Sequence, residues 1–105
     1  MRGVNFSRAA KAHLAGIGRY TEATWGIKQR DLYLGKLFRG FDKLRRSPTS
    51  GKPREELFEG MRSFPVEKHV VYYYFADDEI FIVGVLHERM EPKQHFPPNT
   101  KPGAF

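Results

Sequence analysis

Three side chains in the second half of the chain have the types and spacing that catalysis requires. His87 and Arg89 are two residues apart, so they share a face if a strand continues through them, and Arg62 could lie on a neighbouring strand. Together they could provide a general acid or base for proton transfer and positive charge to stabilise a developing anion. A structural interpretation competes with this one: His87 bonds to the backbone at a strand end, and the arginines pair with glutamates. We favour the structural interpretation.

Other kinds of chemistry find little support in the sequence. The chain has no cysteine, which excludes a disulfide, a thiolate nucleophile and a Cys-based zinc site. Its four histidines follow no spacing typical of a metal site, so we predict no metal and no other cofactor. Tyr72, Tyr73 and Tyr74 could stack on bases, but aromatic residues at alternate strand positions are more often core. The histidines are His13, His69, His87 and His95.

Positive charge is concentrated in the first half of the chain. The net charge is +6, yet residues 1–54 carry thirteen Lys or Arg against three acidic residues, whereas residues 55–105 carry five against nine. An anionic partner is therefore expected to dock on the first half, and it could be nucleic acid or an acidic protein. A basic nucleic-acid-binding module, with affinity that falls steeply with salt, is one alternative for the function.

The elements that must position these side chains begin with two helices. Val4-Asn5-Phe6 could form an edge strand, and Ser7 is a good N-cap. Apolar residues then recur at helical spacing and predict a helix over residues 8–24 that Gly26 ends. A second helical pattern ends at the turn-forming segment 47–53, so the two helices form an antiparallel hairpin. The two apolar faces consist of Ala10, Leu14, Ile17, Thr21 and Trp25, and of Tyr33, Leu37, Phe41 and Leu44.

From residue 61 onward the sequence favours strands. Segments 61–64, 69–75 and 80–87 are rich in β-branched and aromatic residues, and the short polar turn 76–79 joins the last two as an antiparallel hairpin. Both long strands are almost continuously apolar, so we expect one face to pack on the helices and the other to be covered by a partner. Residues 91–105 are proline-rich and are predicted to have little regular structure. We predict one domain over 1–96 and a tail over 97–105.

Short sequence motifs occur at the junctions between these elements. Their order along the chain is a more specific family signal than any single motif. The motifs are Trp25-Gly26, Gly51-Lys52-Pro53-Arg54, Gly60-Met61-Arg62-Ser63-Phe64-Pro65, His69-Val70-Val71-Tyr72-Tyr73 and Val85-Leu86-His87-Glu88-Arg89-Met90. Over residues 4–96 this series resembles the ParE branch of the RelE/ParE toxin superfamily. The resemblance implies an α+β fold, with an N-terminal strand and an antiparallel two-helix hairpin packed on one face of a twisted antiparallel β-sheet.

The resemblance also implies a function and partners. It implies a non-enzymatic toxin of a type II toxin–antitoxin system that binds and poisons DNA gyrase and is neutralised by a ParD-like antitoxin. Nucleic acid would be contacted only indirectly, through gyrase or an antitoxin–operator complex. The alternative within the superfamily is a RelE-like, ribosome-dependent mRNA endoribonuclease using Arg62, His87 and Arg89. No apolar run is long enough to span a membrane, so we expect a cytoplasmic protein.

Candidate binding residues follow from these expectations. The antitoxin is expected to cover an apolar groove between the helices and the sheet and to set acidic residues against their Lys and Arg. The candidates for antitoxin binding are Leu14, Ile17, Leu37, Phe38 and Phe41. The candidates for target binding are Arg62, His87, Arg89, Met90 and Phe96.

Overall fold

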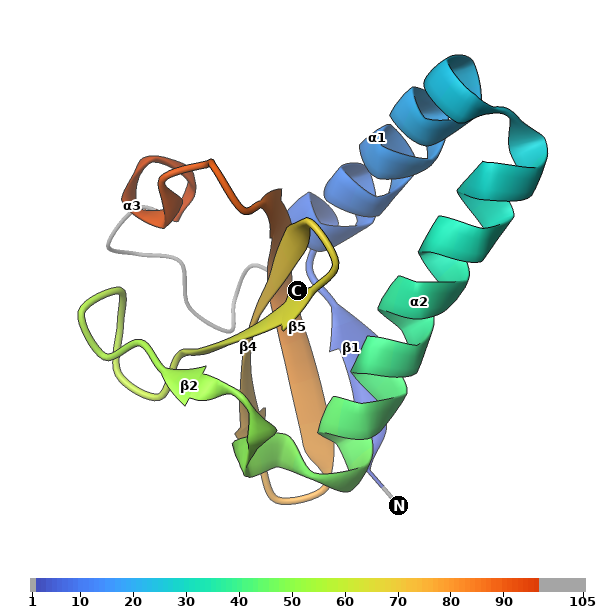
Figure 1. Cartoon of the computed structure of the whole chain (residues 1–105). Helices are drawn as coiled ribbons and strands as arrows, with labels where there is room; N and C mark the ends of the chain where they lie inside the picture. The colour runs from blue at the N-terminus through green and yellow to red at the C-terminus, as the bar shows by residue number, and fades with distance from the viewer. Residues whose placement is uncertain (1, 97–105) are drawn as a thin grey trace.

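The computed structural model describes residues 2–96 and shows a two-helix hairpin packed on a five-stranded sheet (Figure 1). The sheet order is β1-β5-β4-β3-β2, so the first strand lies beside the last. Among the described residues, no helix is long and apolar enough to cross a membrane. The elements are β1 (Gly3–Phe6), α1 (Arg8–Trp25), α2 (Ile27–Arg46), the 3-10 helix η1 (Pro48–Ser50), β2 (Lys52–Pro53), β3 (Arg62–Val66), β4 (His69–Ala76), β5 (Glu79–His87) and α3 (Pro92–His95).

The predicted α+β class and the helical hairpin are confirmed, and the sheet differs from the expectation in two details. β1 pairs with β5 in parallel, with Val4 opposite Ile80, whereas the pairs among β2 to β5 are antiparallel. Lys52 and Pro53, which we expected in a turn, form the short edge strand β2 against β3. Both details depend on pairing between distant segments, which a local pattern does not encode.

Ser7 fixes the start of the hairpin to the sheet. Its Oγ accepts a hydrogen bond from the amide of Ala10 at 2.9 Å and donates one to the carbonyl of Val83 at 2.6 Å. The first bond is the N-cap that the sequence predicts, and the second joins the cap to β5. The other end of α1 is Gly26, whose φ of +95° suits a residue without a Cβ. One side chain therefore both begins α1 and sets its position over the sheet.

The hairpin covers one face of the sheet with a continuous apolar core. Phe6 and Phe41 meet edge to face at 5.3 Å between ring centroids, which joins β1 to α2. α2 also approaches β3 closely, because a Cβ at Gly40 would lie 2.7 Å from Cγ2 of Val66. The buried residues of this core are Ala10, Leu37, Phe41, Leu44, Val71, Tyr73, Ile80, Ile82 and Val85.

The chain itself covers much of the opposite face, which corrects the expectation that a partner would do so. A second core combines Met61, Tyr72, Val83, Leu86 and Phe96, with Leu57 and Phe58 packed against it. The segment between β2 and β3 supplies part of this cover. The rest comes from α3, a short helix inside the region that we predicted to have little regular structure (Figure 1). The predicted tail, 97–105, lies outside the described residues.

Phe96 is the C-terminal anchor of this second core. Its ring is 5 % exposed and lies 5.0 Å from that of Tyr72. Gly84 makes room for it, since a Cβ there would approach the Phe96 ring to 2.7 Å. Burial of a whole aromatic ring stabilises the fold by about 2–3 kcal/mol, so Phe96 holds α3 against the sheet.

The close contact between α2 and β3 can be tested with two glycine substitutions. We expect Gly40→Ala to destabilise the protein by about 1–3 kcal/mol, because the new methyl group overpacks against Val66. Gly35→Ala in the same helix meets only the movable end of Arg39, at 3.4 Å, and is expected to stabilise by about 0.5–1 kcal/mol. Urea unfolding of both variants measures the difference. Equal stabilities would contradict the packing described here.

Candidate functional site

Two grooves lie at the end of the sheet where β4 begins and β5 ends. The first, which we call the histidine groove, lies between α1 and these strands and has a volume of about 450 Å³. All four histidines of the chain line it, although they come from α1, β4, β5 and α3. The groove is lined by Ala12, His13, Gly16, Ile17, Tyr20, Thr21, His69, Val85, Leu86, His87, Met90 and His95. The four histidines are spread along the sequence from His13 to His95, so no local pattern predicts that they converge.

The Nδ1 atoms of three of these histidines are engaged in hydrogen bonds. The amide of Val85 donates to His13 Nδ1 at 3.1 Å, and the amide of Arg89 donates to His87 Nδ1 at 3.2 Å. The hydroxyl of Tyr33 lies 2.5 Å from His69 Nδ1. The rings of His69 and His87 are also in edge contact, with centroids 5.4 Å apart. His87 is therefore a strand-end imidazole that is hydrogen-bonded to the backbone, as the structural interpretation expects.

Burial favours the neutral form of two of these rings. It lowers the pKa of His13 below the ordinary value of 6.5, and a charge on His95 would lower the same pKa further. Burial likewise lowers the pKa of His69, with a second contribution from His87, while Glu88 acts in the opposite direction. His13 and His69 therefore present uncharged imidazoles in the groove at neutral pH.

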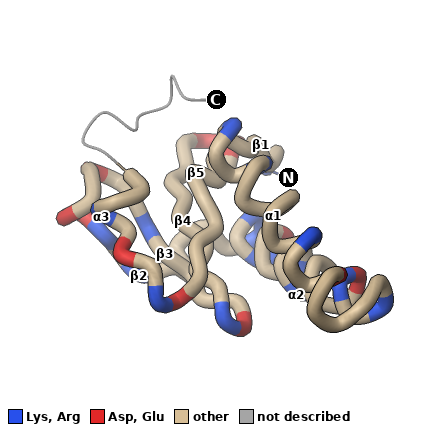
Figure 2. Tube along the Cα trace, turned by 90° about the horizontal axis from the view of Figure 1, so that it is seen from above, with Lys and Arg blue, Asp and Glu red and all other residues tan. Residues whose placement is uncertain are grey.

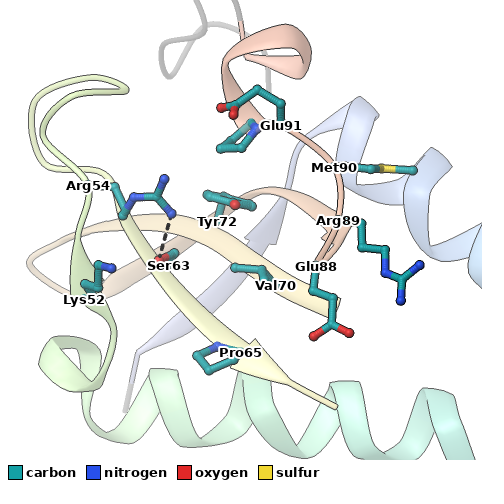
Figure 3. A pocket seen from close by; sticks show the side chains of 11 residues that line it. Lys52, Arg54, Ser63, Pro65, Val70, Tyr72, Glu88, Arg89, Met90 and Glu91 are labelled. Atoms are coloured by element: carbon teal, nitrogen blue, oxygen red, sulfur yellow. Dashed lines mark hydrogen bonds between the residues drawn. The ribbon is translucent and has the colours of Figure 1, made fainter. Parts of the chain in front are cut away.

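The second groove, the sheet groove, lies on the opposite side and has a volume of about 500 Å³ (Figure 3). Arg54 lies 5.6 Å above the ring of Tyr72, donates to Ser63 Oγ at 3.4 Å and pairs with Glu56. The groove is lined by Lys52, Arg54, Ser63, Pro65, Val70, Tyr72, Glu88, Arg89, Met90, Glu91 and Pro92. Lys52 and Arg54 were not predicted as site residues, although both belong to the family-like segment Gly51-Lys52-Pro53-Arg54.

The structure does not bring the three predicted catalytic residues together. Arg62 donates to the carbonyl of Gly51 at 2.7 Å, and its guanidinium lies 5.9 Å from the ring centroid of Phe75. His87 lines the histidine groove, whereas Arg89 lines the sheet groove. A general base, a general acid and a charge-stabilising cation must reach the same phosphodiester. This arrangement of Arg62, His87 and Arg89 does not meet that requirement.

The predicted antitoxin-binding residues divide into core and surface. Leu37 and Phe41 are 0 % and 3 % exposed and belong to the core, because α2 turns that face toward the sheet. Phe38, on the neighbouring face, is 51 % exposed. Leu14 and Ile17 are partly buried on α1, and Ile17 also lines the histidine groove. Only Leu14, Ile17 and Phe38 of this set are therefore accessible to a partner.

The predicted target-binding residues divide in the same way. Phe96 is buried in the second core, and Arg62 is held by the backbone of the segment before β2. Arg89 is exposed in the sheet groove. Met90 is 47 % exposed and lines both grooves. Arg89 and Met90 are the members of this set that present an exposed surface.

The sequence of the domain matches a known family along most of its length. The family described as ParE toxin of type II toxin–antitoxin system, parDE, matches residues 4–92. The chain belongs to the ParE toxin family. Toxin ParE1 of Caulobacter vibrioides is 34 % identical over 95 residues, which cover 90 % of this chain and 98 % of the relative. Toxin ParE1 of Mycobacterium tuberculosis H37Rv is 34 % identical over 86 residues, covering 81 % and 88 %.

A solved structure shares the fold of this ParE toxin. It is a chain of the chromosomal ParDE TA system from P. aeruginosa, with a TM-score of 0.71 and 18 % identity. The similarity covers 83 % of this chain and 96 % of the other. At this identity the similarity shows the fold alone, and it agrees with the two-layer arrangement in Figure 1.

Positive charge is distributed along the helices of this ParE toxin (Figure 2). Part of it is neutralised locally, since Arg30 pairs with Glu22 and Asp31. Other cations form no ion pair within residues 2–96, and these include Arg8, Lys11 and Arg19 on α1. An acidic partner would therefore find unpaired cations on α1, the helix that forms one wall of the histidine groove.

The neutral imidazoles predict a dependence of stability on pH. Because the pKa values of folded His13 and His69 are lowered from 6.5, the unfolded state binds more protons below that pH. Stability is then fully present above about pH 6.5 and falls, by roughly 1 kcal/mol, as the pH drops toward about 5.5. Urea unfolding at both pH values measures this, and the His13→Asn/His69→Asn variant should show a smaller loss. A loss of the same size in both proteins would assign it to other groups.

Proposed function

We propose that this ParE toxin binds DNA gyrase and stalls the enzyme on cleaved DNA, and that a ParD-like antitoxin neutralises it. The supporting observation is the family match over residues 4–92, together with relatives that are named as ParE toxins. The similar solved structure comes from a ParDE system, and this supports the pairing with an antitoxin. Because gyrase acts on DNA in the cytoplasm, the proposal implies a cytoplasmic site of action.

The distribution of exposed residues supports action by binding. Arg89 and Met90 present exposed side chains at the edge of the sheet groove, and we assign them to the target-facing surface. The separation of Arg62, His87 and Arg89 argues against the catalytic arrangement considered for RNA cleavage. In this proposal the toxin contacts nucleic acid only through its protein partners.

A second candidate function comes from the sheet groove. Lys52, Arg54 and Arg89 line it together with Tyr72, which combines cations and an aromatic ring on the sheet (Figure 3). This combination is of the type that the RelE branch uses to cleave messenger RNA. Glu88 and Glu91 line the same groove, and Arg54 is already paired with Glu56. Much of the positive charge is thus compensated, so we place gyrase binding first.

The proposed antitoxin surface combines apolar anchors with unpaired positive charge. Ile17 lines the histidine groove, Leu14 lies on the same helix against the first core, and Phe38 is exposed on α2. Lys11 and Arg19 on the exposed side of α1 would face acidic residues of the antitoxin. We propose that the C-terminal segment of the antitoxin lies along this surface and covers the histidine groove.

Purified gyrase provides the direct test of the target. We expect the toxin to inhibit supercoiling and to trap cleaved DNA, and the antitoxin from the adjacent gene to relieve both effects. Ribosome-dependent cleavage of messenger RNA is measured beside it. Cleavage of the messenger with gyrase unaffected would move the protein to the second candidate function. Affinity for any duplex DNA that falls steeply with salt would instead indicate a nucleic-acid-binding module.

The antitoxin surface can be tested at Phe38. We expect Phe38→Asp to weaken antitoxin binding by about 1–3 kcal/mol, because the substitution replaces an exposed apolar anchor with a charge that repels acidic residues. Leu32→Asp is the matched control, since Leu32 lies on the same helix and is 50 % exposed. Calorimetric titration of the folded variants measures both affinities. Equal affinities for Phe38→Asp and wild type would remove Phe38 from the surface.

A further inference from the structure

The histidine groove holds hydrogen-bond donors that the fold itself does not use. A neutral imidazole that accepts a hydrogen bond at Nδ1 carries its proton on Nε2. His13 and His87 accept backbone amides in this way. For His69 the donor and acceptor roles depend on the tautomer. Because the amide of Lys68 already donates to the Tyr33 hydroxyl at 3.2 Å, we assign the hydroxyl hydrogen to the bond with His69 Nδ1. Three rings of the groove therefore present Nε2–H groups.

The groove offers no acceptor that would match these donors. Its lining contains no Asp or Glu, and the hydroxyl of Thr21 donates to the carbonyl of Ile17 in its own helix at 2.7 Å. Glu88 is the acidic residue that acts on the charge of His69, and it lines the sheet groove instead. No bond to an Nε2 atom of His13, His69 or His87 forms within residues 2–96. An acceptor must come from an occupant or from water.

Charge indicates which kind of acceptor fits. The first 54 residues carry thirteen Lys or Arg against three acidic residues, and Arg8, Lys11 and Arg19 on α1 have no ion pair in the described part of the chain. This surplus of positive charge on the helical half of the chain favours an anionic partner over a neutral one. The described residues also contain no group of three His, Cys, Asp or Glu side chains placed to hold a metal ion. The donors therefore suit a carboxylate.

The walls of the groove indicate what carries that carboxylate. Ile17, Val85, Leu86 and Met90 line it with apolar surface. A free anion would leave this surface exposed to water, whereas a polypeptide segment can bury it while a side chain reaches the imidazoles. His69 and His87 have ring centroids 5.4 Å apart, so a single carboxylate is small enough a group to contact both rings.

We propose that the histidine groove is a carboxylate-binding subsite in which an Asp or Glu side chain, carried on an apolar segment of the antitoxin, accepts hydrogen bonds from Nε2 of His69 and His87. His13 supplies a further donor from α1. The choice of occupant rests on the proposed pairing with an antitoxin. The subsite itself rests on the tautomers, the absence of acids from the lining, and the surplus of positive charge on the helical half of the chain.

Substitution by asparagine separates the outward donors from the internal bonds. The Oδ1 atom of Asn takes the place of Nδ1, so His69→Asn and His87→Asn keep an acceptor for the Tyr33 hydroxyl and the Arg89 amide. Both variants lose the Nε2–H group. Asp78→Asn is the control, because it also introduces an asparagine but at an exposed position in the turn between β4 and β5, remote from the groove. Unchanged thermal unfolding shows that a variant is folded.

The first experiment uses the free toxin and needs no partner. The probe is glutarate, titrated to millimolar concentration at neutral pH while NMR follows the Nε2 and Cε1–H resonances of the histidines. We expect saturable shifts of His69 and His87 with glutarate, no such shifts with the neutral glutaramide, and loss of the effect in the His69→Asn/His87→Asn variant. Equal responses to glutarate and glutaramide, or no response to either, would overturn the subsite.

The second experiment uses the antitoxin from the adjacent gene. We expect its affinity to fall about tenfold or more for the His69→Asn/His87→Asn variant and to stay unchanged for Asp78→Asn. Each Asp and Glu of the antitoxin is then replaced by Asn or Gln. One of these antitoxin variants should bind the wild-type toxin more weakly, yet bind the His69→Asn/His87→Asn toxin no more weakly than the wild-type antitoxin does. This result is the coupling that a double-mutant cycle detects. Equal affinity of wild type and the double variant would overturn the proposal. No binding of the antitoxin to wild type, with the glutarate shifts present, would instead refute the pairing.

Discussion

The fold depends on one constraint: the two central strands, β4 and β5, are apolar on both faces, so both faces of the sheet must be covered. The helical hairpin covers one face, and the side chains of Leu37, Phe41 and Leu44 fill that core. The segment before β3 and the ring of Phe96 cover the other. In a chain of 105 residues there is little apolar surface to spare. The grooves therefore lie at the end of the sheet, where neither cover is complete.

The sequence predicted those parts of the fold whose signals are local. Helical spacing and the Ser7 cap located the hairpin, and β-branched and aromatic runs located β3 to β5. It did not predict the parallel pairing of β1 or the short β2, because each depends on contacts between distant segments. It also missed α3, although the Glu91 cap and Pro92 in its first turn are local signals. The limit set by distant contacts also applied to the second core. Continuous apolar strands showed that two faces needed cover, but they did not show that the chain itself would supply it.

The site residues also divide into those that local sequence signals identify and those that depend on the tertiary structure. Periodicity identified the apolar faces of the helices, yet it did not separate buried Leu37 and Phe41 from exposed Phe38, because neighbouring positions on a helix differ only in rotation. The convergence of four histidines is a tertiary property, since they come from four elements of the fold. The family match identified the class of toxin, and only the arrangement of side chains distinguishes a backbone-bonded His87 from a catalytic one.

Met90 lies where the two grooves meet. Its side chain lines both the histidine groove and the sheet groove, and a flexible thioether adapts readily to whichever neighbour it contacts. A molecule that contacts Met90 in one groove therefore also contacts a wall of the other. The two grooves are two sides of one surface that meet at a single adaptable side chain.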